Sequence, residues 1–284
     1  MPGPNNRSNA RDSQRVIPTD VGRLHPSLAV RDLREALANW PLWGMLGWQD
    51  IRQRYRRSTL GPFWLTLSMG VMVGSIGVVY AVLFKQELSD YLPFVALGFI
   101  LWGFLSGIMI DGCAVFVTSD TIIKQTRLPL SLHVLRVVWR QTIIFGHNFV
   151  IFIVVVIAFR VRLGWEVFLF VPAILIWLAN AVWVSLMLGL VSARYRDIPP
   201  IINSVIQLAF LVTPIIWKAQ LMEERAIFVI ANPVYHFIEI VRQPLLGAAP
   251  EPLSWYVALG VTVLGSLATF ELFRRYRWRV AYWL

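Results

Sequence analysis

Six long apolar stretches divide this 284-residue chain, and they constrain its fold more than any other feature. A helix needs about 20 apolar residues to cross about 30 Å of hydrocarbon, because its backbone rises about 1.5 Å per residue. We expect six transmembrane helices, over residues 63–84, 92–113, 139–159, 167–191, 201–217 and 253–270. The sequence therefore predicts an all-α membrane protein, since a helix satisfies its backbone hydrogen bonds within one segment.

The basic residues predict how the chain is oriented. Of the 26 Lys and Arg residues, 20 lie on one side of the expected spans, mainly before the first span, near Lys124 and Arg194, and after the last span. The positive-inside rule makes that side cytoplasmic, so both termini would face the cytoplasm and the chain would be a multi-pass protein of the bacterial inner membrane. The net charge of +10 points to anionic lipid and not to nucleic acid, because the arginines flank apolar spans.

The chain before the first span has two parts. Residues 1–27 lack an apolar period and are expected to form a disordered cytoplasmic tail. Residues 28–60 place Leu33, Ala36, Leu37 and Trp40 at helical spacing among charged residues, and Pro41 then starts a second helix. We expect amphipathic interfacial helices here, with a soluble helix that packs on a partner as the alternative. Residues 61–284 would form the six-span transmembrane domain.

The segment between the fifth and sixth spans, residues 218–252, is too long for a plain turn, and its apolar runs are too short to span. Asn232 and Pro233 are a good N-cap and first residue for a short helix over 234–243. Two short outer helices that re-enter the membrane are expected, and a surface hairpin is the alternative.

Several chemistries have no matching sequence pattern. The chain lacks G-x-x-x-x-G-K-[ST], G-x-S-G, H-E-x-x-H and D-x-D, and it has one cysteine, Cys113, and four histidines. These absences argue against a nucleotide site, a protease, a metal centre, a glycosyltransferase or disulfide chemistry. We expect a protein that is not an enzyme, has no catalytic or metal-ligating residues and binds no cofactor, so any ATP would be used by another subunit.

Polar residues within the spans leave two interpretations open. Arg140, Gln141, His147 and Asn148 lie along one stripe of the third span, and Asn203 and Gln207 along the fifth. Such stripes either hydrogen-bond neighbouring helices or line a polar conduit. A proton-driven secondary transporter is the alternative class, but its ionisable groups should lie near mid-membrane, whereas Asp111, Glu166 and Glu271 lie near span ends.

Several short motifs resemble, in order and spacing, the type-2 ABC exporter permeases that move lipid-linked O-antigen, capsular and teichoic polymers. The resemblance runs from about Leu33 to the C-terminus and is closest to the O-antigen exporters. Its most specific part is the Ala-Arg-Tyr-Arg-Asp-Ile run at 193–198. The other parts are the motifs at 49–55, 60–64, 122–125 and 128–129, Thr213-Pro214, and Asn232-Pro233 with Arg242.

The resemblance implies a homodimer docked on two copies of a cytoplasmic ABC ATPase, which would bind ATP and Mg, with a lipid-linked polysaccharide passing between the subunits. O-antigen is the first expectation, and capsular or teichoic polymers are alternatives. The resemblance also assigns three groups of residues. The ATPase-coupling loop at 118–130 would use Thr118, Asp120, Lys124, Gln125 and Arg127; the cytoplasmic motif is Arg194, Arg196 and Asp197; and the outer gate contains Asn232, Pro233 and Arg242.

A sugar polymer slides best past flat aromatic surfaces that bind it weakly. The resemblance places the first and fifth spans and the outer segment at the subunit interface, so candidate conduit residues are expected there. They are the aromatic residues Phe63, Trp64, Phe210, Trp217 and Tyr235, with the polar residues Asn203 and Gln207 of the fifth span. An ordinary headgroup belt is the alternative for Trp64 and Trp217. Two further expectations are that Thr213-Pro214 kinks the fifth helix and that Arg194 and Arg196 neutralise Asp197.

Overall fold

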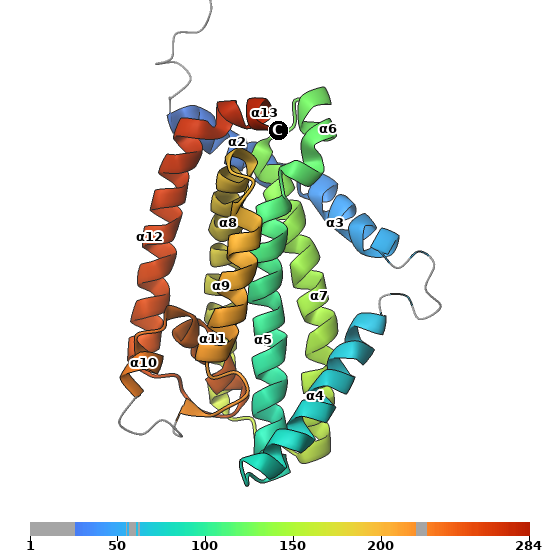
Figure 1. Cartoon of the computed structure of the whole chain (residues 1–284), viewed down its shortest axis with the longest axis vertical. Coiled ribbons are helices and arrows are strands. Elements are labelled where there is room, and N and C mark those ends of the chain that lie inside the picture. Colours follow the sequence, from blue (N-terminus) through green and yellow to red (C-terminus); the bar gives the residue numbers. More distant parts are fainter. Residues whose placement is uncertain (1–25, 55, 57–60, 62, 220–225) are drawn as a thin grey trace, which may run out of the picture.

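The computed structural model describes residues 26–54, 56, 61, 63–219 and 226–284, and the regular structure in these ranges is entirely helical. The helices form an elongated bundle with short helices gathered at both ends, shown in Figure 1. The expected tail, residues 1–27, lies outside the described residues apart from its last two positions.

Five helical segments are long and apolar enough to cross a membrane. They are α4 (Phe63–Leu83), α5 (Leu88–Ala114), α7 (Leu130–Phe159), η2 (Trp165–Leu169) with α8 (Phe170–Arg194), and α12 (Pro252–Tyr276), which continues through η4 (Arg277–Arg279) and α13 (Val280–Trp283). The chain is therefore a multi-pass helical membrane protein. These helices correspond to the first, second, third, fourth and sixth expected spans.

The fifth expected span is shorter than its sequence suggested. Helix α9 (Ile198–Val212) has 15 residues, about 22 Å at the helical rise, and its backbone becomes extended at Thr213. Pro214 explains this end, because a proline has no N–H to donate and pushes the preceding residue out of the helical region. The helix thus ends before Pro214, and the expected kink within one continuous helix over 201–217 is wrong.

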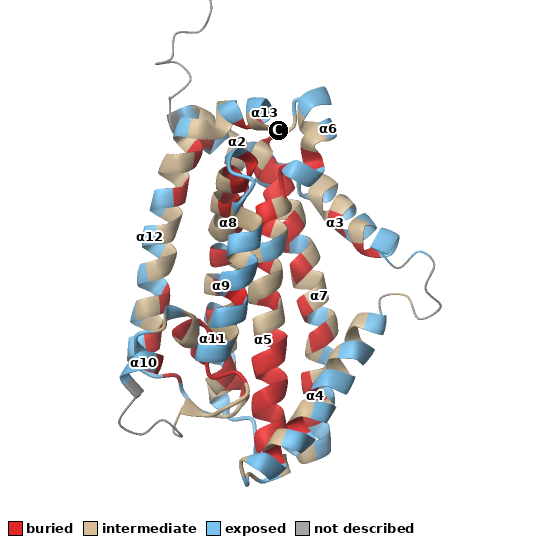
Figure 2. Cartoon of the chain, in the orientation of Figure 1, coloured by how far each residue is buried: buried red, intermediate tan, exposed pale blue. Residues whose placement is uncertain are grey.

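Helix α5 is the centre of the bundle and packs against α4, α7, α8, α9 and α11. Figure 2 shows its buried residues as a nearly continuous run at the end away from the C-terminus. Phe104 stacks on Trp177 of α8 and meets Phe145 of α7 edge-on, with ring centroids 5.7 and 5.5 Å apart. At Gly112 a Cβ atom would lie 2.8 Å from Ser185 Cα, so only glycine permits this close approach of α5 and α8.

Short elements gather beside α13 at the end of the bundle that holds the C-terminus (Figure 1). They include α2 (Pro26–Ala38), α3 (Trp40–Arg54), η1 (Val117–Ser119) and α6 (Asp120–Gln125). Asp32 of α2 holds the first turn of α7, because its carboxylate accepts the backbone N–H groups of Leu130 and Ser131 at 3.1 and 3.0 Å. A carboxylate at this position also stabilises the positive end of the helix dipole. We call this the coupling end.

At the opposite end, α10 (Ala226–Ile230) and α11 (Pro233–Leu245) lie between α9 and α12 in the sequence. Asn232 caps α11, since its side-chain oxygen accepts the Val234 N–H at 3.0 Å, and Pro233 occupies the first turn. Pro244 lies within the last turn of α11, and the helix ends at Leu245. We call this the outer end.

Candidate functional site

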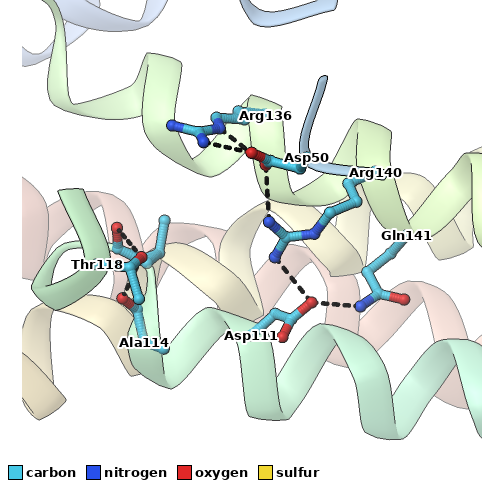
Figure 3. A network of polar contacts seen from close by, with 8 residues as sticks. Asp50, Asp111, Ala114, Thr118, Arg136, Arg140 and Gln141 are labelled. Atoms are coloured by element: carbon cyan, nitrogen blue, oxygen red, sulfur yellow. Dashed lines mark hydrogen bonds and ion pairs between the residues drawn. The ribbon is translucent and has the colours of Figure 1, made fainter. Parts of the chain in front are cut away.

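A network of four charged side chains joins three helices at the coupling end (Figure 3). Asp50 on α3 accepts two hydrogen bonds from Arg136 of α7, one of them 2.9 Å long, and one of 2.8 Å from Arg140. Arg140 also donates to Asp111 of α5 at 2.8 Å, so its guanidinium lies between two carboxylates. Gln141 adds a second hydrogen bond to Asp111. We call these five residues the inner network.

The inner network is well suited to hold helices in register. Its four charged side chains are largely buried, with 12–21% of each exposed, and each charge has a partner of opposite sign. Ion pairs shielded from water in this way are costly to break, because separation leaves an uncompensated charge. A displacement of α7 is therefore passed to α3 and α5 together.

Burial alone would raise the pKa of Asp50, but hydrogen bonds and positive charge from Arg136 and Arg140 outweigh it, so the pKa lies below its usual value. Ionised Asp50 thus stabilises the fold above the ordinary carboxyl pKa of about 3.9, and this stabilisation is lost as pH falls through the lower folded-state value. We expect the thermal unfolding midpoints of wild type and Asp50→Asn to converge as pH falls from about 5 to about 3. A constant difference across this range contradicts the assignment.

The residues expected in the coupling loop lie together at the coupling end. Helix α6 contains Asp120, Lys124 and Gln125, has no buried residue, and projects beyond the long helices in Figure 1. Lys124 pairs with Asp120 at 2.8 Å, an exposed ion pair between neighbouring turns. Thr118 and Arg127 flank α6 and are exposed. The structure thus presents this loop at the surface, and its role in coupling stays a prediction.

The cytoplasmic motif is arranged differently from the expected ion pair. Arg194 lies over the rings of Tyr195 and Trp283, 5.2 and 5.5 Å from their centroids, which is a cation–π arrangement. Among the described residues, no ion pair joins Arg194 or Arg196 to Asp197. All three side chains are exposed at the coupling end.

A second polar cluster lies at the outer end, where the segment after α9 is irregular. Arg242 of α11 donates to the Pro214 carbonyl at 2.8 Å, and Tyr91 of α5 donates to the Ile216 carbonyl at 2.5 Å. Asn232 donates to the Thr213 hydroxyl at 2.9 Å. These bonds satisfy groups that the broken helix leaves without partners, as buried backbone requires. We call Tyr91, Thr213, Asn232, Glu239 and Arg242 the outer cluster.

Arg242 is the most deeply buried charge in the outer cluster. Its side chain is 2% exposed, it pairs with Glu239 one turn earlier on α11, and its guanidinium lies 4.0 Å from the centre of the Phe94 ring. Gln243 donates a further hydrogen bond to Glu239. Two of the expected gate residues, Asn232 and Arg242, are thus brought together on the segment that ends α9.

The candidate conduit residues do not form one group. Phe63 and Trp64 are exposed at the start of α4, and Asn203 and Gln207 are exposed on α9. Phe210 instead packs on Phe99 and Trp102 of α5, with ring centroids 5.9 and 5.6 Å away. Trp217 and Tyr235 are half-buried at the outer end. The conduit assignment stays a prediction.

Four residues that organise these sites were given no site role from the sequence, which are Asp32, Asp50, Arg136 and Glu239, although Asp50 lies in the motif at 49–55. Glu239 had a readable signal, because it lies three residues before Arg242 in an apolar segment, the spacing of a helical ion pair. The Asp50–Arg136 contact spans 86 positions in the sequence, and one sequence carries no local signal for such a pair.

The apolar helices and the two polar clusters define a multi-pass membrane protein in which charged side chains tie helices together. The family described as ABC-2 type transporter matches residues 41–246, well over half of the chain. The chain belongs to the ABC-2 type transporter family, and the expected resemblance to ABC exporter permeases is confirmed.

Three curated relatives carry the name O-antigen export system permease protein RfbA. The one from Myxococcus xanthus is 22% identical over 234 residues, which cover 80% of this chain and 90% of the relative. Two from Klebsiella pneumoniae are 21% identical over 82% of this chain and 91% of the relative, and 23% identical over 67% and 74%. The match therefore extends over most of both chains at low identity.

Proposed function

We propose that this chain is the transmembrane subunit of an ATP-driven exporter that moves a lipid-linked polysaccharide, O-antigen in type, across the bacterial inner membrane. The observation that carries the proposal is the family match over residues 41–246, together with O-antigen export permeases as relatives over most of their length.

The energy source of this exporter is a separate subunit. The sequence lacks the G-x-x-x-x-G-K-[ST] loop that cradles nucleotide phosphates, so ATP and Mg are bound by a cytoplasmic ABC ATPase, present in two copies. Helix α6 docks on that ATPase with Thr118, Asp120, Lys124, Gln125 and Arg127. The coupling end, which holds α2 and the C-terminus, therefore faces the cytoplasm, and by the positive-inside rule both termini belong on that side.

The inner network carries the movement of α6 into the bundle. Four residues connect α6 to α7, and Asp32 holds the first turn of α7. Arg136 and Arg140 lie two and three turns further along α7, where they bind Asp50 of α3 and Asp111 of α5. A displacement of α6 is thus transmitted both to the interfacial helices, residues 28–60, and to the six-span domain, residues 61–284.

The substrate passes between two copies of this chain. Helix α9 has one buried residue, Ile206, and Figure 2 shows the rest of it as intermediate or exposed. Asn203 and Gln207 are exposed one turn apart on α9, and side-chain amides are costly in lipid. This face meets the second copy and the polar conduit. Helices α10 and α11 then complete the fifth span as re-entrant outer elements.

Deletion of the gene in its native host tests this proposal. We expect surface polysaccharide to be lost and a lipid-linked glycan to accumulate inside the cell, where lipid extraction and sugar analysis identify it. Re-expression of the chain at its natural level restores the surface polymer. Unchanged surface polysaccharide in the deletion strain, with no glycan inside, contradicts the proposed function.

A further inference from the structure

A polar pocket of about 280 Å³ lies beside the inner network, between α3, α5, η1 and α7. Its walls include Asp50 and Arg54 of α3, Asp111 of α5 and Thr118 of η1; the α7 wall is formed by His133, Arg136, Val137 and Arg140. Figure 3 shows Thr118 apart from Asp50 and Arg140, which line the same pocket. The pocket shares Thr118 with the coupling loop, and none of the candidate conduit residues lines it.

Several groups in this pocket have no hydrogen-bond partner among the described residues. His133 is 1% exposed and both of its ring nitrogens are unpaired, as is the buried Nε of Arg140. Arg54 forms no ion pair within the described parts of the chain. A buried polar group without a partner costs about 1–3 kcal/mol, so an occupant that supplies partners is favoured.

The charge of the lining determines what that occupant is. Three arginines, Arg54, Arg136 and Arg140, face two carboxylates, Asp50 and Asp111, which leaves a positive surplus. The unpaired arginine groups are donors, and a histidine ring always offers at least one N–H. An anion that only accepts hydrogen bonds, with oxygens that point in several directions, satisfies the arginine groups and the one N–H of His133 together. A phosphate group has this chemistry.

The position of α3 indicates the source of the phosphate. Trp40, Met45 and Trp48 are exposed on α3, whereas Gly47 and Ile51 are buried towards the bundle. Exposed tryptophans on a helix that ends in arginines are typical of the headgroup layer. The pocket on the inner side of α3 is therefore at the depth where lipid phosphates lie, and a membrane lipid reaches it without leaving the bilayer.

We propose that this pocket binds the phosphate of an anionic membrane lipid, with Arg54, His133 and Arg140 Nε as the donors. The bound headgroup completes the polar contacts between α3 and α7 beside the inner network. The proposal goes beyond the export function, since it concerns a lipid of the surrounding bilayer and depends on neither the polysaccharide nor the ATPase.

The test uses the full chain in detergent, titrated with dioctanoyl phosphatidylglycerol and followed by native mass spectrometry. Arg54→Gln removes an exposed charge that lines the pocket, and we expect it to weaken binding about tenfold, as for the loss of one charge-assisted contact. His133→Leu weakens binding similarly, and His133→Gln, which keeps a donor, restores most of it. Arg52→Gln on the same helix lies outside the pocket and is the matched control, with unchanged affinity.

Equal affinity of wild type, Arg54→Gln and His133→Leu overturns the proposal. Equal weakening by Arg52→Gln and Arg54→Gln also overturns it, because the effect is then diffuse surface charge. Inorganic phosphate that binds as tightly as the lipid excludes a lipid site. If Arg54→Gln weakens association with the ATPase and leaves lipid affinity unchanged, the pocket takes an acidic side chain of the partner instead.

Discussion

Arg242→Met is expected to lower the free energy of unfolding by about 3–5 kcal/mol, the largest effect on stability that we expect from a single substitution in this chain. The side chain of Glu239 is 6% exposed, and the substitution leaves its carboxylate buried without its cationic partner. The Pro214 carbonyl also loses its donor, in a segment where the broken helix supplies none. The unfolding midpoint of the purified chain in detergent measures this loss.

A double variant separates the contribution of the Arg242–Glu239 ion pair to stability from the contribution of the other contacts of Arg242. Arg242→Met with Glu239→Met removes both charges, and replacing a buried ion pair by apolar groups is often neutral or stabilising. We therefore expect the double variant to recover most of the stability lost in Arg242→Met. A double variant as unstable as the single one shows that the contacts of Arg242 with Phe94 and Pro214, and not the charge of Glu239, stabilise the outer cluster.

Lys124→Glu is expected to reduce ATP-dependent export at least about tenfold, the largest functional effect that we expect. The lysine is exposed on α6, so its reversal changes the surface offered to the ATPase and leaves the core untouched. A tenfold loss corresponds to about 1.4 kcal/mol of docking or coupling energy, in the range of a charge-assisted contact. Surface glycan at matched expression, and ATPase binding to the purified chain, measure the effect.

Arg31→Glu provides the matched control for this reversal. Arg31 and Glu35 on α2 form an exposed ion pair four residues apart at the same end of the molecule, as Asp120 and Lys124 do on α6. Both reversals should change stability by less than about 0.5 kcal/mol, the usual range for surface substitutions. We expect normal export from Arg31→Glu. Equal losses in both variants attribute the effect to the overall charge of the coupling end and contradict docking at α6.

Much of the fold is predictable from the sequence, because a membrane-spanning helix can be predicted from the length and composition of its own apolar run. The apolar runs that became α4, α5, α7, α8 and α12 have the length and composition that a bilayer requires. The cap of α11 is equally local, since Asn232 and Pro233 alone supply an acceptor and a restrained backbone. The end of α9 at Thr213 was misjudged, although the effect of Pro214 on its neighbour is also local.

The polar clusters could not be predicted from one sequence, because they depend on contacts between distant parts of the chain. The inner network joins Asp50, Asp111 and Arg140, which are far apart along the chain and meet only when α3, α5 and α7 pack. The sequence had placed Arg140 and Gln141 on one stripe, either as contacts between helices or as a conduit wall. The structure shows them in contacts between helices, as hydrogen-bond donors to Asp111.

Transport in sealed vesicles tests the central claim most directly. The purified chain is reconstituted with and without the host's ABC ATPase, the lipid-linked glycan is placed on the ATPase side, and its appearance on the other side is measured. We expect transport that needs both the ATPase and hydrolysable ATP, is reduced at least about tenfold by Lys124→Glu, and is unaffected by an uncoupler of the proton gradient. Transport by this chain alone, driven by a proton gradient without ATP, would contradict the account and assign the chain to the secondary transporters.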